Sequence, residues 1–376
     1  MALDLTVTYP AQTESGADGY PHGKARNANS PNDGNGFPLE RRWLNDLFGA
    51  RQAILDAAEI DPSGSPDEVG ASDLLDALDA LYFRRGALGA IAANWFPRTP
   101  ADSFAGNFLG VAYSPDLSLF VAVGANGAIQ TSPDGVVWTT QTPASPYSDN
   151  FGAVAWGGSV FVAIGQNGEI QTSPDGETWT HRNPSGAYGG TFSGITWTGS
   201  LFCAVGQSGA IQTSPDGTSW TARTPDDSFT GTFTAVTSSG SLIVAVGQGG
   251  EIQTSPDGVT WTLRSSDSFA GFFRGVTWNG SRFIAVGDGG AIQTSDDGVT
   301  WTARTPGPAS SSFFAVASTG PLTVAVGRGI QSSYDGITWS SQLGDRSPLR
   351  GVAWSGGMFV AAGDDGEILS SLKVTP

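Results

Sequence analysis

Apolar and polar residues alternate in short runs along most of the chain, with turn-forming residues between the runs. Gly110 to Tyr113 and Phe120 to Gly124 are apolar runs, and they are followed by Ile129-Gln130-Thr131 and Trp138-Thr139. Short runs bounded by Gly, Pro, Asp and Ser are typical of β-strands. The pattern therefore predicts a chain made mainly of short strands joined by tight turns.

One seven-residue frame recurs between the third and fourth strand of each set. It runs from Ser132 to Trp138 as Ser-Pro-Asp-Gly-Val-Val-Trp, and its copies begin at Ser173, Ser214, Ser255, Ser295 and Ser333. The tryptophans that end these copies are 41, 41, 41, 40 and 38 residues apart. A period near ~40 residues with four short strands per repeat is typical of a β-propeller blade.

The chemistry of the frame predicts a tight hairpin. Proline presets φ at the second position, aspartate bonds its neighbouring backbone, and glycine accepts a positive φ. We expect the tryptophan to pack between blades and the aspartate to cap the N–H groups of the turn. The aspartates at this position are Asp134, Asp175, Asp216, Asp257, Asp297 and Asp335.

The frame resembles the Asp-box of sialidase-like (BNR) propellers, whose pattern is Ser-x-Asp-x-Gly-x-x-Trp. Here glycine directly follows aspartate, so the loop is one residue shorter than in that pattern. The resemblance covers about three quarters of the chain and implies the propeller fold. It implies no activity, because the box is a structural turn in propellers of unrelated function.

Seven inner strands precede these frames, beginning at Gly110, Ala153, Gly194, Ala235, Gly275, Ala315 and Gly351. The last copy ends near Ser370 without a Trp strand, whereas Trp95-Phe-Pro-Arg-Thr-Pro100 matches Trp220-Thr-Ala-Arg-Thr-Pro225. Residues 91–376 therefore predict a mainly β fold, a seven-bladed β-propeller, closed by pairing residues 94–99 with the three carboxyl-terminal strands. Such closure hides sheet edges that would otherwise promote aggregation.

The residues before the repeats divide into two segments. Residues 1–37 are poor in core residues and predict an extended arm. Residues 38–90 predict a small α-helical domain, with apolar residues three or four positions apart. Two helices of this size cannot form a full core alone, so we expect an attachment or oligomerisation segment. Its apolar face includes Leu39, Trp43, Leu47, Leu55 and Leu78.

This segment resembles the amino-terminal part of tailed-phage tail fibres. The likeness rests on Gly36 to Glu40, Trp43 to Asp46, Ala53 to Ala58 and Pro62 to Asp67. It implies a virion protein, synthesised in the host cytoplasm, which attaches to other tail proteins and forms a homo-oligomer, a homotrimer in most fibres of this kind. Its expected targets are a host-surface glycan or an outer-membrane protein. A simple helical oligomerisation module is the alternative.

Composition narrows the classes of partner. The chain has 376 residues, of which 53 are Gly and 22 are Pro, and its net charge is −17. This charge argues against nucleic acid and anionic membranes as partners. The amino terminus lacks a signal peptide, and no apolar run reaches the ~20 residues that span a bilayer. The single cysteine, Cys203, lies in a strand pattern and predicts a buried apolar residue.

Candidate ligand contacts lie in the loops opposite the Asp turns. A polar ring is expected from Asn126, Gln166, Gln207, Gln248, Asp288, Arg328 and Asp364. Tyr147 and Tyr188 lie in the blade-to-blade loops, where aromatic rings beside amides suit sugar faces. Phe104, Phe229 and Phe269 share an Asp-Ser-Phe frame and predict structural anchors. Hydration of the ring's mouth is the alternative role of the polar set.

Catalytic residues are hard to assign. Only His22 and His181 are present, and the arginines that recur at one outer-strand position are repeat features. A Ca²⁺ site at residues 364–367 has too few ligands, and a solvated loop is the simpler interpretation. We therefore expect no cofactor, no metal and no enzyme. The predicted function is a phage receptor-binding protein, with a structural virion spacer or a glycan-cleaving enzyme as alternatives, the latter using Asp288 or Asp364.

Overall fold

The computed structural model describes residues 91, 93–144, 147–226, 229–266, 268–307, 311–344 and 346–373. The chain divides into two compact units, Met1–Gly89 and Ala90–Pro376, and all of the described residues belong to the second. The predicted arm and helical segment, with Leu39, Trp43, Leu47, Leu55 and Leu78, lie outside the described residues. Within the described part, no helix combines the length and apolarity needed to traverse a bilayer.

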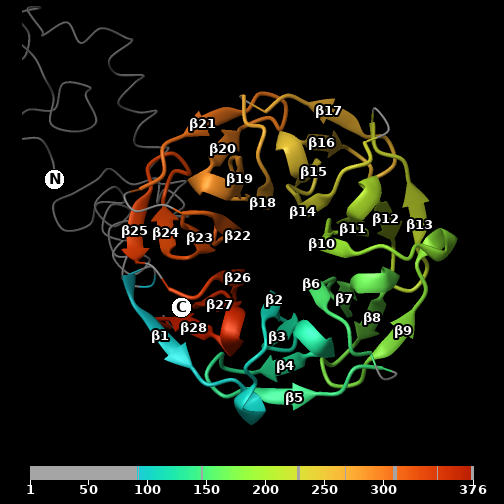
Figure 1. Ribbon diagram of the computed structural model, residues 1–376, viewed down its shortest axis with the longest axis vertical. Helices are drawn as coiled ribbons and strands as arrows, with labels where there is room; N and C mark the ends of the chain where they lie inside the picture. Colours follow the sequence, from blue (N-terminus) through green and yellow to red (C-terminus); the bar gives the residue numbers. More distant parts are fainter. Residues whose placement is uncertain are drawn as a thin grey trace, which may run out of the picture. The chain divides into compact units, whose positions relative to one another are not determined.

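The second unit is a ring of seven four-stranded antiparallel sheets, so the predicted seven-bladed β-propeller is confirmed. In the six sheets that follow the chain in order, the first strand lies nearest the ring centre and the fourth forms the outer rim (Figure 1). The strands are short because a turn residue interrupts the apolar pattern every four to seven positions.

Six blades follow the chain in order. Blade 1 comprises β2 (Phe108–Ser114), β3 (Leu119–Gly124), β4 (Ile129–Ser132) and β5 (Thr139–Gln141). Blade 2 comprises β6 (Phe151–Trp156), β7 (Phe161–Gly165), β8 (Ile170–Ser173) and β9 (Thr180–Arg182). Blade 3 comprises β10 (Phe192–Trp197), β11 (Phe202–Gly206), β12 (Ile211–Ser214) and β13 (Thr221–Arg223). Blade 4 comprises β14 (Phe233–Ser238), β15 (Ile243–Gly247), β16 (Ile252–Ser255) and β17 (Thr262–Arg264). Blade 5 comprises β18 (Phe273–Trp278), β19 (Phe283–Gly287), β20 (Ile292–Ser295) and β21 (Thr302–Arg304). Blade 6 comprises β22 (Phe313–Ser318), β23 (Thr323–Gly327), β24 (Ile330–Ser333) and β25 (Ser340–Leu343).

Blade 7 combines strands from both ends of the repeat region. It contains β26 (Leu349–Trp354), β27 (Phe359–Gly363) and β28 (Ile368–Ser371), and its outer strand is β1 (Trp95–Arg98). β1 pairs antiparallel with β28, with Trp95 opposite Ser371 and Arg98 opposite Ile368. The first and last described strands of the unit are thus neighbours in one sheet.

The hydrogen bonds that hold the recurrent frame lie within the turn itself, as blade 2 shows. In blade 2, Asp175 Oδ1 accepts hydrogen bonds from the backbone N–H of Glu177 (2.9 Å) and Thr178 (2.7 Å) and from the Ser173 hydroxyl (2.9 Å). Gly176 has φ of +79°, which only glycine adopts without strain. Trp179 Nε1 donates to the Gly176 carbonyl oxygen at 3.0 Å. The turn thereby fixes the tryptophan that immediately precedes the fourth strand.

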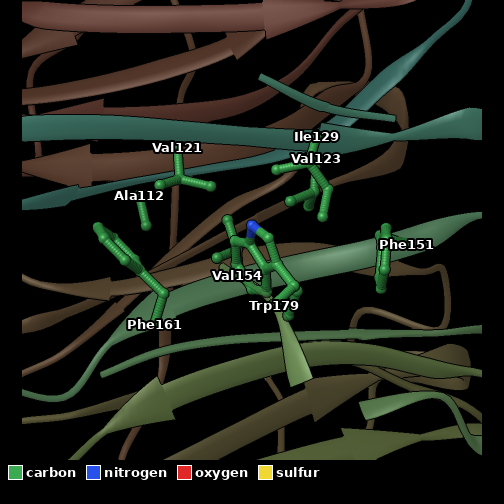
Figure 2. Close-up of a cluster of buried hydrophobic side chains, with 9 residues drawn as sticks. Ala112, Val121, Val123, Ile129, Phe151, Val154, Phe161 and Trp179 are labelled. Atoms are coloured by element: carbon green, nitrogen blue, oxygen red, sulfur yellow. The ribbon is translucent and has the colours of Figure 1, made fainter. Parts of the chain in front are cut away.

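Apolar side chains from adjacent blades fill the seams between them. Figure 2 shows the seam between blades 1 and 2, where the Trp179 ring lies among Val154, Phe151 and residues of blade 1. The buried members are Ala112, Val121, Val123, Ile129, Phe151, Val154, Phe161, Ala163 and Trp179. Equivalent clusters occupy further seams. Buried aliphatic and aromatic side chains, rather than strand pairing, therefore join the sheet of one blade to that of the next.

The inner strands approach one another very closely at their third residue. A Cβ added to Gly194 would lie 2.8 Å from the Cα of Ala235, and one added to Gly110 would lie 2.9 Å from that of Ala153. One partner of each such pair must therefore lack a side chain. Around the ring the residues at this position are Gly110, Ala153, Gly194, Ala235, Gly275, Ala315 and Gly351.

Candidate functional site

We call the end of the ring opposite the Asp turns the upper face. It is formed by the loops between second and third strands and by the loops that link blades. The former contain short 3-10 turns: η2 (Ala125–Gly127), η3 (Gln166–Gly168), η5 (Gln207–Gly209), η7 (Gln248–Gly250), η8 (Asp288–Gly290) and η9 (Asp364–Gly366). In η2, η3, η5, η7 and η9 the last glycine donates its N–H to a linking loop, as Gly168 does to the Gly190 carbonyl oxygen (2.7 Å). The two sets of loops thus form one surface.

A buried glutamine holds most of the linking loops. Gln171 in β8 accepts from the Ala144 N–H (2.8 Å) and donates to the Ala144 carbonyl oxygen (3.0 Å), although Ala144 precedes blade 2. Gln130, Gln212, Gln253 and Gln331 hold Ala101, Ser185, Asp226 and Gly307 in the same way. We call this arrangement the glutamine latch. Sequence reasoning missed it, although the signal was the Ile-Gln pair repeated in six third strands.

Tyr147 and Tyr188 occupy the same loop position as the three phenylalanines that predict structural anchors. The Tyr188 ring lies 4.6 Å from that of Phe192, and Phe229 lies 4.7 Å from Phe233 in the equivalent pair. The Tyr188 hydroxyl donates to the carbonyl oxygens of Thr191 (3.1 Å) and Gln207 (3.0 Å). Burial raises its pKa to about 12. This geometry places both tyrosines as loop anchors, with Phe104 and Phe269 as their other equivalents.

The pKa of Tyr147 is also raised, by burial and then by the nearby charges of Glu169 and Asp149. Its hydroxyl donates to the carbonyl oxygens of Asn150 (2.9 Å) and Gln166 (3.3 Å), and its ring lies 4.6 Å from Phe151. Both half-buried tyrosines therefore have their polar and apolar groups engaged within the loops.

The predicted polar ring needs one correction. Gln166, Gln207, Gln248, Asp288 and Asp364 each begin a 3-10 turn, but Asn126 is the second residue of its turn and corresponds to Asn167. Ala125 holds the ring position in blade 1. Asn126 has φ of +57°, the left-handed conformation that asparagine tolerates well. Its position was misassigned because it is the first polar residue of the Ala-Asn-Gly turn, whereas Gln166 comes first in Gln-Asn-Gly.

Members of the ring differ in what they bind. The Oε1 atoms of Gln166 and Gln207 accept from the N–H of Asn150 and Thr191, both at 3.2 Å. Asp288 and Asp364 are instead bound by arginines on the inner strands of their own blades. Arg274 donates to Asp288 through Nε and Nη2, both at 2.9 Å. Arg350 donates to Asp364 in the same bidentate manner, at 3.0 and 2.8 Å.

The two arginines also stack on aromatic rings. The Arg350 guanidinium lies 4.2 Å from the centre of the Phe314 ring, and that of Arg274 lies 4.5 Å from Phe272. Arg350 belongs to blade 7 and Phe314 to blade 6, so this stack crosses a seam. Cation–π contacts of this kind contribute about 0.5–1 kcal/mol at exposed sites. Together with the bidentate carboxylates, they fix the orientation of both guanidinium groups.

Arg328 completes this region of the upper face. Its side chain is exposed, and it makes no hydrogen bond, ion pair or ring contact with another described residue. Its carbonyl oxygen accepts from the Arg346 N–H at 2.8 Å, and the Arg346 side chain pairs with Glu367. We call Arg274, Phe314, Arg328, Arg346 and Arg350 the arginine corner. It lies on blades 5, 6 and 7 and on the loop that leads into blade 7.

The described residues offer little for catalysis. His181 is exposed and its Nδ1 lies 3.1 Å from Glu169 Oε1, on the outer rim. No group of His, Cys, Asp and Glu suited to a metal ion occurs in the described part of the chain. Cys203 is fully buried, and burial raises the pKa of its thiol to about 12 although the nearby Arg223 opposes this. Asp288 and Asp364 are each neutralised by an arginine, which does not suit a pair of glycosidase carboxylates.

Comparison with known proteins identifies the class of fold. No protein-family model matches the chain, and no curated protein matches it. A structure of YCF48 bound to D1 peptide is similar, with a TM-score of 0.61 and 20% identity, covering 75% of this chain and 97% of the YCF48 chain. YCF48 from Cyanidioschyzon merolae is similar with a TM-score of 0.59 and 18% identity, covering 74% and 99%. These likenesses show a shared seven-bladed propeller fold.

The predicted role as a phage tail fibre is wrong. The two similar structures named above are of YCF48, one of them bound to D1 peptide, and neither is a phage fibre or a sialidase-like protein. The glycan-cleaving alternative stays a prediction, whereas the same finding removes the basis for both virion roles, the fibre and the spacer. The tail proteins and glycans predicted as partners lose their support with them.

Proposed function

We propose that this chain is a binding propeller that holds an extended segment of a partner protein on the arginine corner. The observation that carries the proposal is the change in residue type around the upper ends of the inner strands. Blades 1–4 have Leu109, Gly152, Ser193 and Thr234 there, whereas blades 5–7 have Arg274, Phe314 and Arg350. The charged and aromatic residues at this strand position therefore lie together on one side of the ring.

The corner is suited to peptide groups. Arginine and aromatic residues dominate the binding energy of protein interfaces, because they combine apolar area with directional donors. Each guanidinium has five N–H donors, and the bidentate bond to Asp288 or Asp364 uses two of them. The remaining donors can bind carbonyl or carboxylate oxygens with little loss of rotamer freedom, since stacking already fixes the side chain.

Arg328 gives the site a preference for partner segments that carry an acidic side chain. Its guanidinium is exposed and has no carboxylate partner among the described residues. A partner segment that carries an Asp or Glu side chain would satisfy it, with a charge-assisted bond of the kind that arginine makes best. The similar YCF48 structure with a bound D1 peptide supports a peptide as the type of ligand.

Selection from a displayed random-peptide library tests the proposal. The immobilised full chain should enrich peptides with at least one acidic residue, and their affinity should fall several-fold between about 50 and 300 mM salt. Arg328→Gln should weaken binding of the selected peptides about tenfold to a hundredfold, because an interfacial charge-assisted bond contributes roughly 1.5–3 kcal/mol.

Arg264→Gln is the matched control. Arg264 lies on the outer rim, where its Nε donates to Thr254, and glutamine already holds the equivalent positions 141 and 342. This variant should bind the peptides as the parent does. Equal weakening by Arg264→Gln, or full binding by Arg328→Gln, would contradict the assignment of the site.

A further inference from the structure

Two features secure the loops that enter most blades. In the loops before blades 1–5, an aromatic ring stacks on the phenylalanine that begins the inner strand, as Tyr147 does on Phe151. The glutamine latch then ties the loop backbone to the third strand, as Gln171 does with Ala144. Blade 6 lacks the aromatic ring in its entering loop but keeps the latch, through Gln331 and Gly307.

Blade 7 lacks both features. Its inner strand begins with Leu349 in place of phenylalanine, and residues 344–348 contain no aromatic residue. The latch position is occupied by Leu369, which is fully buried and has no polar atom to offer the loop. The loop between β23 and β24 is also shorter than its equivalents, with only Arg328 and Gly329 between the two strands. The seam between blades 6 and 7 is therefore built differently from the rest.

Charged groups take the place of the missing features. Arg346, in the entering loop, pairs with Glu367 at the start of the third strand. Their side chains are only 23% and 19% exposed, and Arg346 Nε and Glu367 Oε2 are buried without a hydrogen-bond partner among the described residues. Arg350 crosses the same seam to stack on Phe314. A partly buried pair with unmet hydrogen bonds recovers less of its desolvation cost than a satisfied amide latch.

We propose that the seam between blades 6 and 7 is the joint at which the ring opens, and that the Arg346–Glu367 pair is its closing contact. Opening there breaks no pairing between sheets, because β22 and β26 belong to different sheets, but it removes the blade packed against β26 and so lets β26 fray from β27. The backbone N–H of Arg346 bonds to the Arg328 carbonyl oxygen, so Arg346 stays with blade 6. Opening therefore separates Phe314, Arg328 and Arg346 from Glu367 and Arg350 of blade 7, and it dismantles the arginine corner. The joint depends only on contacts within this chain, and it stands or falls independently of the proposed peptide.

Hydrogen exchange of the full chain, followed by mass spectrometry without any peptide present, tests the joint. Amides of β26 (Leu349–Trp354) should exchange at least about tenfold faster than those of β10 (Phe192–Trp197), which is the equivalent strand of a latched blade. Glu367→Gln should accelerate exchange in β26 by a further several-fold and leave β10 unchanged. Raising the salt from about 50 mM to about 1 M should act in the same direction on the parent protein.

Two variants keep the outcome decisive. The double variant Arg346→Gln with Glu367→Gln should lose the salt response, because the charges that salt screens are gone. Gln171→Leu, which gives blade 2 the residue found in blade 7, should accelerate exchange in β6 and not in β26. Equal protection of β26 and β10 in the parent, or exchange that changes in all blades together on Glu367→Gln, would overturn the proposal.

Discussion

The glutamine latch allows a quantitative prediction for Gln171→Leu. Gln171 is fully buried and its amide makes three hydrogen bonds: two with the Ala144 backbone (2.8 and 3.0 Å) and one to Glu169 Oε1 (2.7 Å). Leucine is close in volume, and the same strand position in blade 7 holds a fully buried Leu369. The substitution therefore removes hydrogen bonds with little change in packing.

The expected loss comes from the groups left without partners. An unsatisfied buried N–H or C=O costs about 1–3 kcal/mol, and the half-buried Ala144 places its two groups at the lower end of that range. Extra apolar burial by leucine offsets part of the loss. We expect a net decrease of roughly 2 kcal/mol in the free energy of unfolding, which corresponds to a fall of about 4 °C or more in the melting temperature.

Urea unfolding followed by tryptophan fluorescence measures this change, because eleven of the twelve tryptophans lie in the second unit and only Trp43 lies before it. Thr140→Leu is the control, since Thr140 is exposed on the outer strand of blade 1; it should change stability by less than about 0.5 kcal/mol. A loss from Gln171→Leu as small as that of the control would refute the idea that the latch stabilises the ring.

Three further outcomes are expected. Hydrogen bonds from the hydroxyl and N–H of Thr218 and from the Ser219 N–H lower the pKa of Asp216 to about 2 from 3.8. The stability that Asp216 contributes is therefore present above about pH 4 and is lost as the pH falls toward 2. In acid unfolding of Asp216→Asn, the free energy of unfolding should depend less steeply on pH over this range than it does in the parent protein. Tyr188→Phe should cost about 1 kcal/mol in thermal melting, because it removes two hydroxyl bonds but keeps the ring that Phe229 provides in blade 4. Gly194→Ala should cost about 1–3 kcal/mol in urea unfolding, because its Cβ would meet the backbone of Ala235 at 2.8 Å, whereas Gly189→Ala, where an added Cβ meets nothing within 4 Å, should be nearly neutral.

The blades could be predicted because their signals are local. The frame from Ser132 to Trp138 contains its own turn, cap and packing residue, so each copy specifies its hairpin without reference to distant residues. The match between Trp95 and Trp220 likewise pointed to the strand that the structure pairs with β28. Repetition then supplied the number of blades.

The site could not be predicted in the same way, because its contacts depend on which side chains face one another across strands and seams. Arg274 and Asp288 are 14 residues apart, as are Arg350 and Asp364, and this equal spacing was the available sign of two ion pairs. The stack of Arg350 on Phe314 joins two blades, so the sequence of neither repeat alone contains a signal for it. The tail-fibre prediction failed for a related reason: short helix and turn motifs outside the propeller constrain local structure and not function.

At the third position of the inner strands, glycine and alanine alternate from one blade to the next, and this alternation depends on whether the number of blades is even or odd. A pattern with a period of two can be satisfied completely only by an even number of blades, so a ring of seven must break it once. The break falls where Gly351 meets Gly110, whose Cα would lie 3.2 Å from a Cβ built on Gly351. The single exception to the alternation thus lies at the boundary between the last blade and the first, so this pair of glycines marks the point at which the series of blades begins.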